Sequence, residues 1–362
     1  MSDATSTELV ERVFVRGIRK LRRLILASFA VVALMPTAVF SHHSAAPYDS
    51  TREVVFEGTV TELEWKNPHV LMTIETRADG GSLVLQEIEA SALSQVRTWG
   101  LPREAIAPGQ TVVVRAWPNR SGPRARVLGI DIKTSDGRVY ALNLQAAGSF
   151  RLSSAAPATG LAGRWVPTAE SWNEALSWAG SDFPFTEAGR TARAELARTL
   201  ATRGTTRTEF CEQRPSLPVM LLPELRTIEV GESSIVMSLE AEGVHQQRMV
   251  LMDGTAHPAG LTPSLLGHSI GRWESDTLVI DTVGIAPHII GSFAVASTAS
   301  THLIERLRLT ADRRQLEYTF TVEDPAHLTS PISYTALWDH RPDLEPSLEV
   351  CDPENARRAL VQ

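Results

Sequence analysis

Hydrophobic and polar positions alternate along most of the chain after residue 53, and this pattern predicts a protein built mainly from β-strands. Val54, Phe56, Gly58 and Val60 share one face of a first strand, because successive side chains of a strand point to opposite faces. At Leu63 the hydrophobic pattern resumes on the other parity. We therefore expect a β-bulge just after Val60.

The rest of the first half predicts a small closed barrel. We expect a short helix near residues 92–99 with Ser91 as its N-cap, and further strands at residues 70–76, 83–89, 111–117 and 125–133. Asp136-Gly137 is a hairpin signal that leads into a last strand at residues 138–144. Three strands, one helix and two strands, in that order, are typical of an OB-like barrel.

The second half predicts a larger antiparallel barrel. Residues 146–160 are rich in Ala, Ser, Gly, Pro and Thr and are expected to be a linker. One helix is expected at residues 186–201, and residues 211–223 are expected to form an ordered crossing loop. After a first strand at Gly163, we expect eight short strands at residues 226–230, 234–239, 246–252, 267–273, 277–283, 302–310, 315–323 and 332–339.

Tryptophans favour a barrel of lipocalin type for this second half. The tripeptide Gly-Arg-Trp occurs at residues 163–165 and again at residues 271–273, and it resembles the tripeptide whose Trp closes one end of lipocalin-type barrels. We expect Trp165, Trp273 and Trp338 to act as such hydrophobic plugs.

The N-terminal segment has a different pattern. Residues 19–23 are mostly basic and residues 24–40 are almost entirely apolar. Val39 and Ser41 are small enough for the −3 and −1 positions of a signal-peptidase site. We expect a secretory signal over residues 1–41 and export to the periplasm or beyond. An uncleaved membrane anchor is the alternative.

Charge limits the partners of the chain. It has 35 basic and 42 acidic residues, for a net charge of −7. Six of the basic and three of the acidic residues precede His42, so the remainder carries −10. This acidic balance argues against nucleic acid as a partner. We expect contact with a membrane only through the N-terminal segment.

The two cysteines, Cys211 and Cys351, are consistent with export. In an oxidising compartment they are expected to form one disulfide, which would stabilise the fold by about 3–5 kcal/mol. Two unpaired buried thiols are the alternative. No CxxC spacing is present, so a zinc-finger interpretation has no support.

Short motifs at the start of the first barrel resemble a known family. They are His42-His43-Ser44, Tyr48-Asp49, Glu57-Gly58-Thr59-Val60 and Trp65-Lys66-Asn67-Pro68-His69. Together they resemble the bacterial domain-of-unknown-function family 6152, over residues 41–145. Its members are small secreted proteins without an established activity, so the resemblance implies a compartment and an architecture.

Part of the second half resembles a widespread, uncharacterised exported module. The resemblance lies in residues 271–282, 302–306 and 321–325. Ser275 stands where such modules usually carry Gly, and Ser300-Thr301-His302 replaces a His-Ser-Asp run. If that run is catalytic in the other modules, this departure weakens the case for catalysis here.

A first candidate site is a metal centre formed by His42, His43 and His69. After cleavage at Ser41, His42 would offer its amine and a ring nitrogen to one metal ion, and His69 would complete a nitrogen-rich site suited to copper. Asp49 would add an oxygen ligand. The alternative is an exposed pair of histidines and a His69 that caps a local turn.

A second candidate site lies on the C-terminal barrel. It would bring together Arg248, His268, Glu274, Asp276, Asp281, His302 and Glu305, with Arg272 and Arg306 beside them. A carboxylate beside a histidine in a barrel mouth suits ligand binding or general acid–base catalysis. The alternative is that residues 274–276 form a hairpin turn and that Glu305 and Arg306 form a cross-strand charge pair.

The sequence thus predicts an exported, mainly β protein with a signal at residues 1–41, an OB-like barrel at 42–145, a linker at 146–160 and a larger barrel at 161–362. The leading hypothesis is a periplasmic binding protein for a small ligand or a metal ion. An enzyme acting on an apolar small molecule inside the second barrel and a cell-envelope interaction module are the alternatives. No nucleophile elbow, phosphate loop or dinucleotide fingerprint is present.

Overall fold

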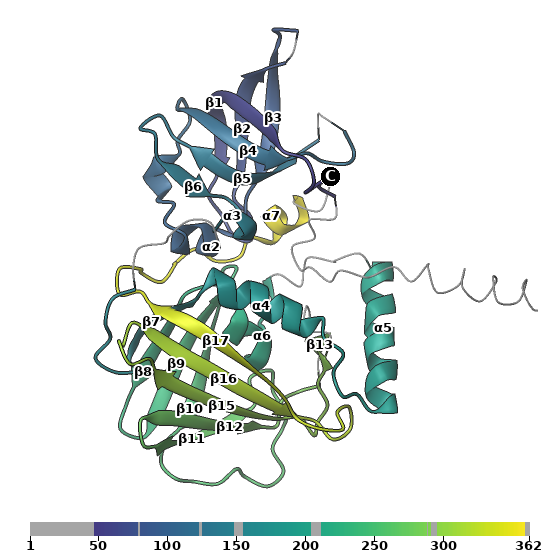
Figure 1. Ribbon diagram of the computed structural model, residues 1–362, viewed down its shortest axis with the longest axis vertical. Helices are drawn as coiled ribbons and strands as arrows, with labels where there is room; N and C mark the ends of the chain where they lie inside the picture. Colours follow the sequence, from purple (N-terminus) through teal and green to yellow (C-terminus); the bar gives the residue numbers. More distant parts are fainter. Residues whose placement is uncertain are drawn as a thin grey trace, which may run out of the picture. The chain divides into compact units, whose positions relative to one another are not determined.

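Two closed β-barrels follow one another along the chain, as the strand pattern predicted (Figure 1). The computed structural model describes residues 47–78, 80–122, 125–147, 155–203, 211–287, 289–290 and 295–358. Both barrels belong to one compact unit, Ser41–Gln362. The predicted signal segment and residues 148–154 of the predicted linker lie outside the described residues.

The first barrel is a sheet in the order β3-β2-β1-β4-β5-β6. A parallel pairing of β3 with β5 closes it through Ile88 and Val127. Short helical segments α2 (Leu93–Thr98), η1 (Arg103–Ala105) and α3 (Leu144–Ala147) accompany the sheet. The strands are β1 (Val54–Glu64), β2 (Leu71–Arg77), β3 (Leu83–Glu89), β4 (Thr111–Trp117), β5 (Val127–Lys133) and β6 (Val139–Ala141).

Local sequence features shape the first barrel. The register of β1 against β2 shifts between Val60 and Glu62, so the predicted bulge is confirmed. Gly58 lets these two strands approach closely, because a Cβ atom there would collide with the backbone of Glu75. The predicted helix cap is wrong, because Ala92 occupies the N-cap of α2. The amide of Ser91 instead donates a hydrogen bond to the carbonyl of Leu142.

The second barrel closes in the order β10-β11-β12-β15-β16-β17-β7-β8-β9. Adjacent strands of this barrel are antiparallel except β10 and β11, which pair in parallel and are joined by residues 252–267. The strands are β7 (Gly163–Pro167), β8 (Arg226–Val230), β9 (Ser234–Ala241), β10 (Val244–Leu251), β11 (His268–Glu274), β12 (Thr277–Val283), β15 (His302–Leu309), β16 (Gln315–Glu323) and β17 (Ile332–His340). A separate two-stranded sheet pairs β13 (Ile289–Ile290) with β14 (Val295–Ala296).

Large aromatic side chains fill much of the second barrel. Trp165 and Trp338 are completely buried, and Trp338 stacks on Tyr318 with ring centroids 4.7 Å apart. The Cζ atom of Arg226 lies 4.9 Å from the centroid of the same Trp338 ring. Burial lowers the pKa of Arg226 to about 9. The expectation for Trp273 is wrong, because its side chain points outward from β11 and is 48% exposed.

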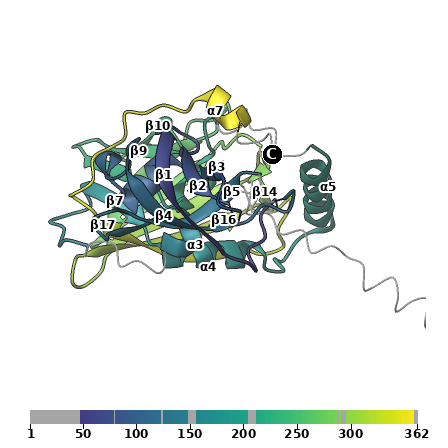
Figure 2. The same cartoon turned by 90° about the horizontal axis from the view of Figure 1, so that it is seen from above.

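Three helices accompany the second barrel: α4 (Ala169–Ala179), α5 (Glu187–Arg203) and α6 (Ser216–Leu221). Only α5 was predicted. The hydroxyl of Thr168 accepts a hydrogen bond from the amide of Ser171 at 3.1 Å, as an N-cap residue does at the start of a helix. The predicted crossing loop contains α6, whose apolar residues join the barrel core. Figures 1 and 2 show α5 at the side of the barrel, whereas α4 packs on β17.

A buried carboxyl group connects the two barrels. Glu224 is completely buried just before β8. One of its oxygens accepts a hydrogen bond from Gln95 of α2 at 3.3 Å, and the other accepts from the Glu242 amide at 2.7 Å. Burial, together with the charges of Glu242 and Glu240, raises the pKa of Glu224 to about 8.

We predict that Glu224 makes stability fall as the pH rises. In the unfolded chain this carboxyl titrates near pH 4.5, whereas the folded protein keeps its proton up to about pH 8. Between these values the folded form binds the additional proton, so the free energy of unfolding decreases by up to about 1.4 kcal/mol per pH unit. Below pH 4.5 this contribution is fully present, and above pH 8 it is lost.

Urea unfolding of the oxidised protein at pH 5, 6.5 and 8 measures this effect. Because Glu240 also has a raised pKa, the informative quantity is the difference between the wild type and Glu224→Gln. We expect the free energy of unfolding of the wild type, relative to that of the variant, to decrease as the pH rises. A difference that does not change with pH would contradict the assignment.

Candidate functional site

The predicted metal site is only partly described. His42 and His43 lie outside the described residues, and Asp49 instead accepts hydrogen bonds within its own turn. The ring of His69 is buried, and its Nδ1 lies 3.0 Å from a carboxylate oxygen of Glu89. Within the described part of the chain, no group of three or more His, Cys, Asp or Glu side chains is arranged to hold a metal ion. Copper binding therefore stays a prediction.

Glu89 is the centre of a buried polar cluster in the first barrel. Its Oε2 accepts a hydrogen bond from the Tyr48 hydroxyl at 2.9 Å and lies 3.5 Å from Arg126, while its Oε1 faces His69. Arg126 also pairs with Glu87 at 2.9 Å. Burial disfavours the guanidinium charge, but the hydrogen bond to Glu87 and the charges of both carboxylates outweigh this and raise the pKa of Arg126. The cluster therefore neutralises Glu89 inside the barrel.

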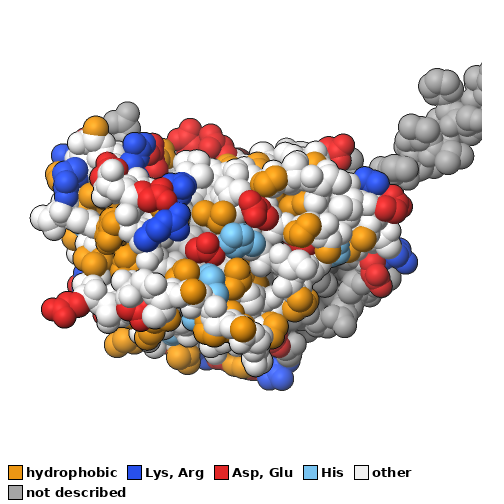
Figure 3. All heavy atoms as spheres, turned by 90° about the horizontal axis from the view of Figure 1, so that it is seen from below, with side chains coloured by type: hydrophobic (Ala, Val, Ile, Leu, Met, Phe, Trp, Pro, Cys, Tyr) orange, Lys and Arg blue, Asp and Glu red, His pale blue; other side chains and the backbone are white. Residues whose placement is uncertain are grey.

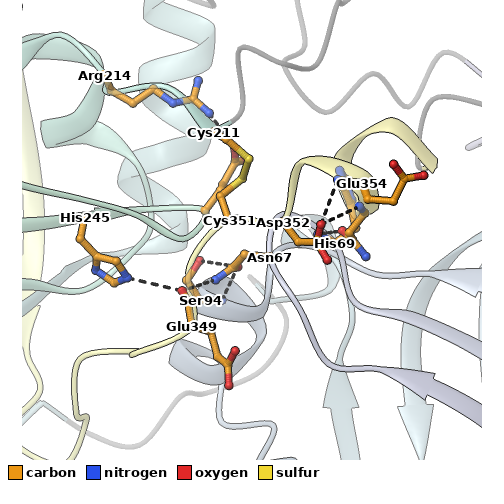
Figure 4. Close-up of a disulfide and its surroundings, with 12 residues drawn as sticks. Asn67, His69, Ser94, Cys211, Arg214, His245, Glu349, Cys351, Asp352 and Glu354 are labelled. Carbon is orange, nitrogen blue, oxygen red and sulfur yellow. Dashed lines mark hydrogen bonds and ion pairs between the residues drawn. A yellow bond between two sulfur atoms is a disulfide. The ribbon is translucent and has the colours of Figure 1, made fainter.

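The C-terminal segment covers the same region. The predicted disulfide between Cys211 and Cys351 is present, with Cα atoms 5.3 Å apart. Figure 4 shows this bond beside Asn67, and α7 (Pro353–Arg358) follows it along the chain. The predicted staple thus holds the end of the chain next to the Asn-Pro-His motif of the first barrel.

Two of the predicted ligand-binding residues meet inside the second barrel. Arg248 and Glu305 form a bidentate ion pair, in which Arg248 Nη1 lies 2.9 Å from Glu305 Oε1 and Nη2 contacts Oε2. Arg248 also donates to the hydroxyls of Ser269 and Thr282 at 3.1 and 2.7 Å. The Tyr318 hydroxyl donates to Glu305 at 2.8 Å.

This interior network is closed. All of its members are at least nine-tenths buried, and each nitrogen of the Arg248 guanidinium has an oxygen partner. Burial, helped by the Glu305 charge, raises the pKa of Tyr318 well above its usual value, so Tyr318 remains a hydrogen-bond donor. The network therefore joins five neighbouring strands from within, β10, β11, β12, β15 and β16, and each nitrogen of its guanidinium is already used.

The two histidines of the second candidate site, His268 and His302, join one cluster on the outside of the same barrel. His302 Nε2 lies 2.8 Å from Asp281 Oδ1, and His257 Nε2 lies 3.1 Å from the same oxygen. His257 Nδ1 lies 2.8 Å from His268 Nδ1, and His302 Nδ1 lies 3.3 Å from Glu323 Oε2. We call these five residues the imidazole–carboxylate cluster. Its side chains are partly open to solvent; Asp281 is 28% and His302 is 30% exposed.

Hydrogen-bond geometry assigns the protons in this cluster. His257 donates from Nε2 to Asp281, so in its neutral form its Nδ1 is an acceptor and His268 must donate from Nδ1. That leaves the lone pair of His268 on Nε2, which bonds to no described residue. His302 faces one carboxylate with each nitrogen, and both contacts are hydrogen bonds only when both nitrogens carry a proton.

The strands explain why these residues converge. Asp281 and His302 have the outward parity of β12 and β15, whereas Thr282 and Leu303 next to them point into the core. The connection between β10 and β11 brings His257 over this face. Figure 3 shows histidine side chains at the surface of the molecule, near acidic and hydrophobic ones.

The remaining predicted residues lie elsewhere. Ser275 has a positive φ of 57°, so residues 274–276 form the turn of the β11–β12 hairpin. Glu274 pairs with Arg272 and Arg306 at 2.7 and 2.8 Å, at the exposed surface, and Asp276 accepts from its neighbour Thr277. The turn interpretation is confirmed, while the alternative pairing of Glu305 with Arg306 is wrong because Glu305 points inward.

His257 is a member of the cluster that the sequence pattern does not indicate. It stands in a connection without strand or helix periodicity, where nothing in the local pattern marks it. Its only signal is the sequence His257-Pro258 within a long connection, and long connections often carry function. Glu323 ends β16, and the sequence indicated it as part of a strand and of the resemblance over residues 321–325, without a role in a site.

Comparison with known families bears on the first barrel. Residues 30–128 match a family of unknown function, DUF6152. This is the family that the N-terminal motifs resemble, and the matched region includes the Asn-Pro-His motif and the buried cluster around Glu89. No curated protein matches the chain. Among the described residues, no helix is long and apolar enough to cross a membrane.

We predict that the interior ion pair is a structural requirement. Glu305→Ala leaves the Arg248 charge buried without a partner, which should lower the free energy of unfolding by about 3–5 kcal/mol. The double change Arg248→Met with Glu305→Leu removes both charges and should cost much less. Urea unfolding of the oxidised protein measures both.

Glu274→Ala is the matched control, because it breaks an ion pair at the exposed surface of the same barrel. It should leave the unfolding midpoint nearly unchanged. A Glu305→Ala variant as stable as this control would show that the interior network does not hold the barrel together.

Proposed function

We propose that this chain is an exported binding protein that holds a small ligand at the imidazole–carboxylate cluster. The observation that carries the proposal is the lone pair of His268 Nε2, which bonds to none of the described residues and ends a chain of hydrogen bonds from Asp281 through His257. A fixed tautomer gives this nitrogen a defined role as an acceptor. The interior network offers no comparable free group, because its donors and acceptors are paired with each other.

The chemistry of the cluster indicates the class of ligand. The carboxylates of Asp281 and Glu323 belong to the same cluster as this lone pair. A lone pair beside a negative charge favours a ligand that presents an N–H or O–H donor or a positive charge. A small polar molecule of this kind fits the described geometry better than a metal ion, since no preformed metal geometry is present among the described residues.

Export is a second part of the proposal. It is supported by the basic and apolar pattern of residues 1–41. The disulfide between Cys211 and Cys351 is a bond typical of oxidising compartments. Both observations support our proposal that the ligand site works in the periplasm or outside the cell.

An enzyme is the second candidate. The series Asp281–His257–His268 resembles, in its hydrogen bonding, a carboxylate that orients a general base through an imidazole. In that case His268 Nε2 would take a proton from the bound molecule. Conversion of the ligand by the wild type, and not by Asp281→Asn, would favour this candidate over simple binding.

Native mass spectrometry of the full chain, purified from the envelope of its own cells, tests the proposal. We expect the wild type to begin at His42 and to carry an additional noncovalent mass. His268→Ala should lose that mass, because the acceptor nitrogen is gone.

The matched control is His245→Ala, which removes an exposed imidazole from β10 of the same barrel, outside the cluster. This variant should keep the bound mass. A wild type without any bound mass, or a His268→Ala variant that keeps it, would exclude the cluster as the site, and an N-terminus at Met1 would exclude cleavage.

A further inference from the structure

The Asn-Pro-His motif of the first barrel holds the C-terminal segment by specific hydrogen bonds. The carbonyl of Asn67 accepts from the Asp352 amide at 2.9 Å, and its side-chain amide donates to the Glu349 carbonyl at 3.2 Å. The backbone amide of His69 donates to the side chain of Asn355 at 3.1 Å. The motif thus forms hydrogen bonds both with an extended stretch before α7 and with the first turn of α7 (Figure 4).

Asp352 is the central residue of the bound segment. Its Oδ1 accepts from the amides of Glu354 and Asn355 at 2.9 and 3.3 Å, so it caps α7. Its Oδ2 lies 2.9 Å from Lys66 Nζ, and this ion pair lowers the pKa of Asp352 through the Lys66 hydrogen bond. One side chain therefore both shapes the segment and binds the residue before Asn67.

The opposite side of the segment rests on the second barrel. The Cys351 amide donates to the carbonyl of Gly243 at 3.0 Å. A Cβ atom at Gly243 would lie only 2.6 Å from the Cys351 nitrogen and 2.7 Å from Asn67 Cβ, so only glycine leaves room for the segment here. The disulfide to Cys211 then fixes the segment between the two surfaces.

We propose that residues 66–69 form a docking site for a peptide of the type Asp-Pro-x-Asn preceded by an extended residue, and that the chain's own residues 349–358 are its tethered occupant. The disulfide acts as the latch that keeps this occupant bound. The site lies in the region that matches the family, residues 30–128, whereas the occupant comes from more than two hundred residues further along the chain. This site is separate from the imidazole–carboxylate cluster and does not depend on it.

The contacts between residues 349–358 and the first barrel are of a kind that lets this segment detach while both barrels stay folded. The segment is held by directional hydrogen bonds and two ion pairs, Asp352 with Lys66 and Arg358 with Glu64. The hydrophobic side chain of Val350 within the segment and that of Leu348 just before it point away, with exposed fractions of 69% and 93%. A short segment held in this way can open locally while the barrels remain folded. The tether gives it a high effective concentration, so a free peptide competes only when the tether is weakened.

Fluorescence anisotropy with a labelled synthetic peptide of residues 346–358, carrying Cys351→Ser, tests the proposal. The receptor is the full chain with Cys351→Ser, Asp352→Ala and Asn355→Ala, which weakens its own tail. We expect the peptide to bind this variant and not the oxidised wild type, whose site is filled.

Two altered peptides give the specificity. A peptide with Asp352→Ala and Asn355→Ala loses the cap and the bond to His69, and should bind at least about tenfold more weakly. A peptide with Leu348→Ala and Val350→Ala is the matched control and should bind as tightly as the unaltered one, because those side chains face solvent.

The proposal is overturned if the receptor keeps the circular dichroism of the native chain and the labelled peptide fails to bind, or if the two altered peptides bind equally well. If the receptor does not fold, hydrogen exchange on the unaltered chain with and without reductant decides. Joint loss of protection at residues 352–358 and at His69 on reduction, with the strands still protected, supports the docking site. Exchange of these amides only together with the strands shows that the segment is a fixed part of the fold and overturns it.

Discussion

The disulfide between Cys211 and Cys351 is the constraint on which the arrangement of the chain's end depends. It spans 140 residues and closes a loop that contains nearly all strands of the second barrel, and such a long closed loop greatly restricts the unfolded chain. Its location matters as much as its loop length. The bond lies where the C-terminal segment meets Asn67, so a covalent link in the second half of the chain also positions hydrogen bonds to the first barrel.

The strands of the second barrel serve two different purposes on their two faces. Along β12, Thr282 points inward to Arg248, while its neighbour Asp281 points outward to two imidazoles. Along β15, Glu305 points inward and His302 outward. Because side chains alternate along a strand, a closed ion pair and an open cluster of titratable groups lie on opposite faces of the same few strands. The inner network ties together the strands that carry the outer cluster.

Much of the architecture was predictable because it depends on local patterns. The strand at residues 83–89, the bulge after Val60 and the closed order of the first barrel follow from alternation and turn residues. The grouping of Arg248 with Glu305 and of His268 with His302 was not predictable in this form. All four were candidates for one site, and the inward or outward parity of each strand divided them into two.

By itself, the sequence determined the class of fold, the family that residues 30–128 match and the pairing of its two cysteines, because periodicity, motif spacing and a count of two leave few alternatives. Only the tertiary structure decided which charged side chains became part of the core and which became part of the imidazole–carboxylate cluster at the surface. His257 joins the cluster through a connection with no pattern of its own, and Asn67 meets a segment from the far end of the chain. Contacts between residues so distant in sequence arise from barrel closure and crosslinking, and no local signal records them.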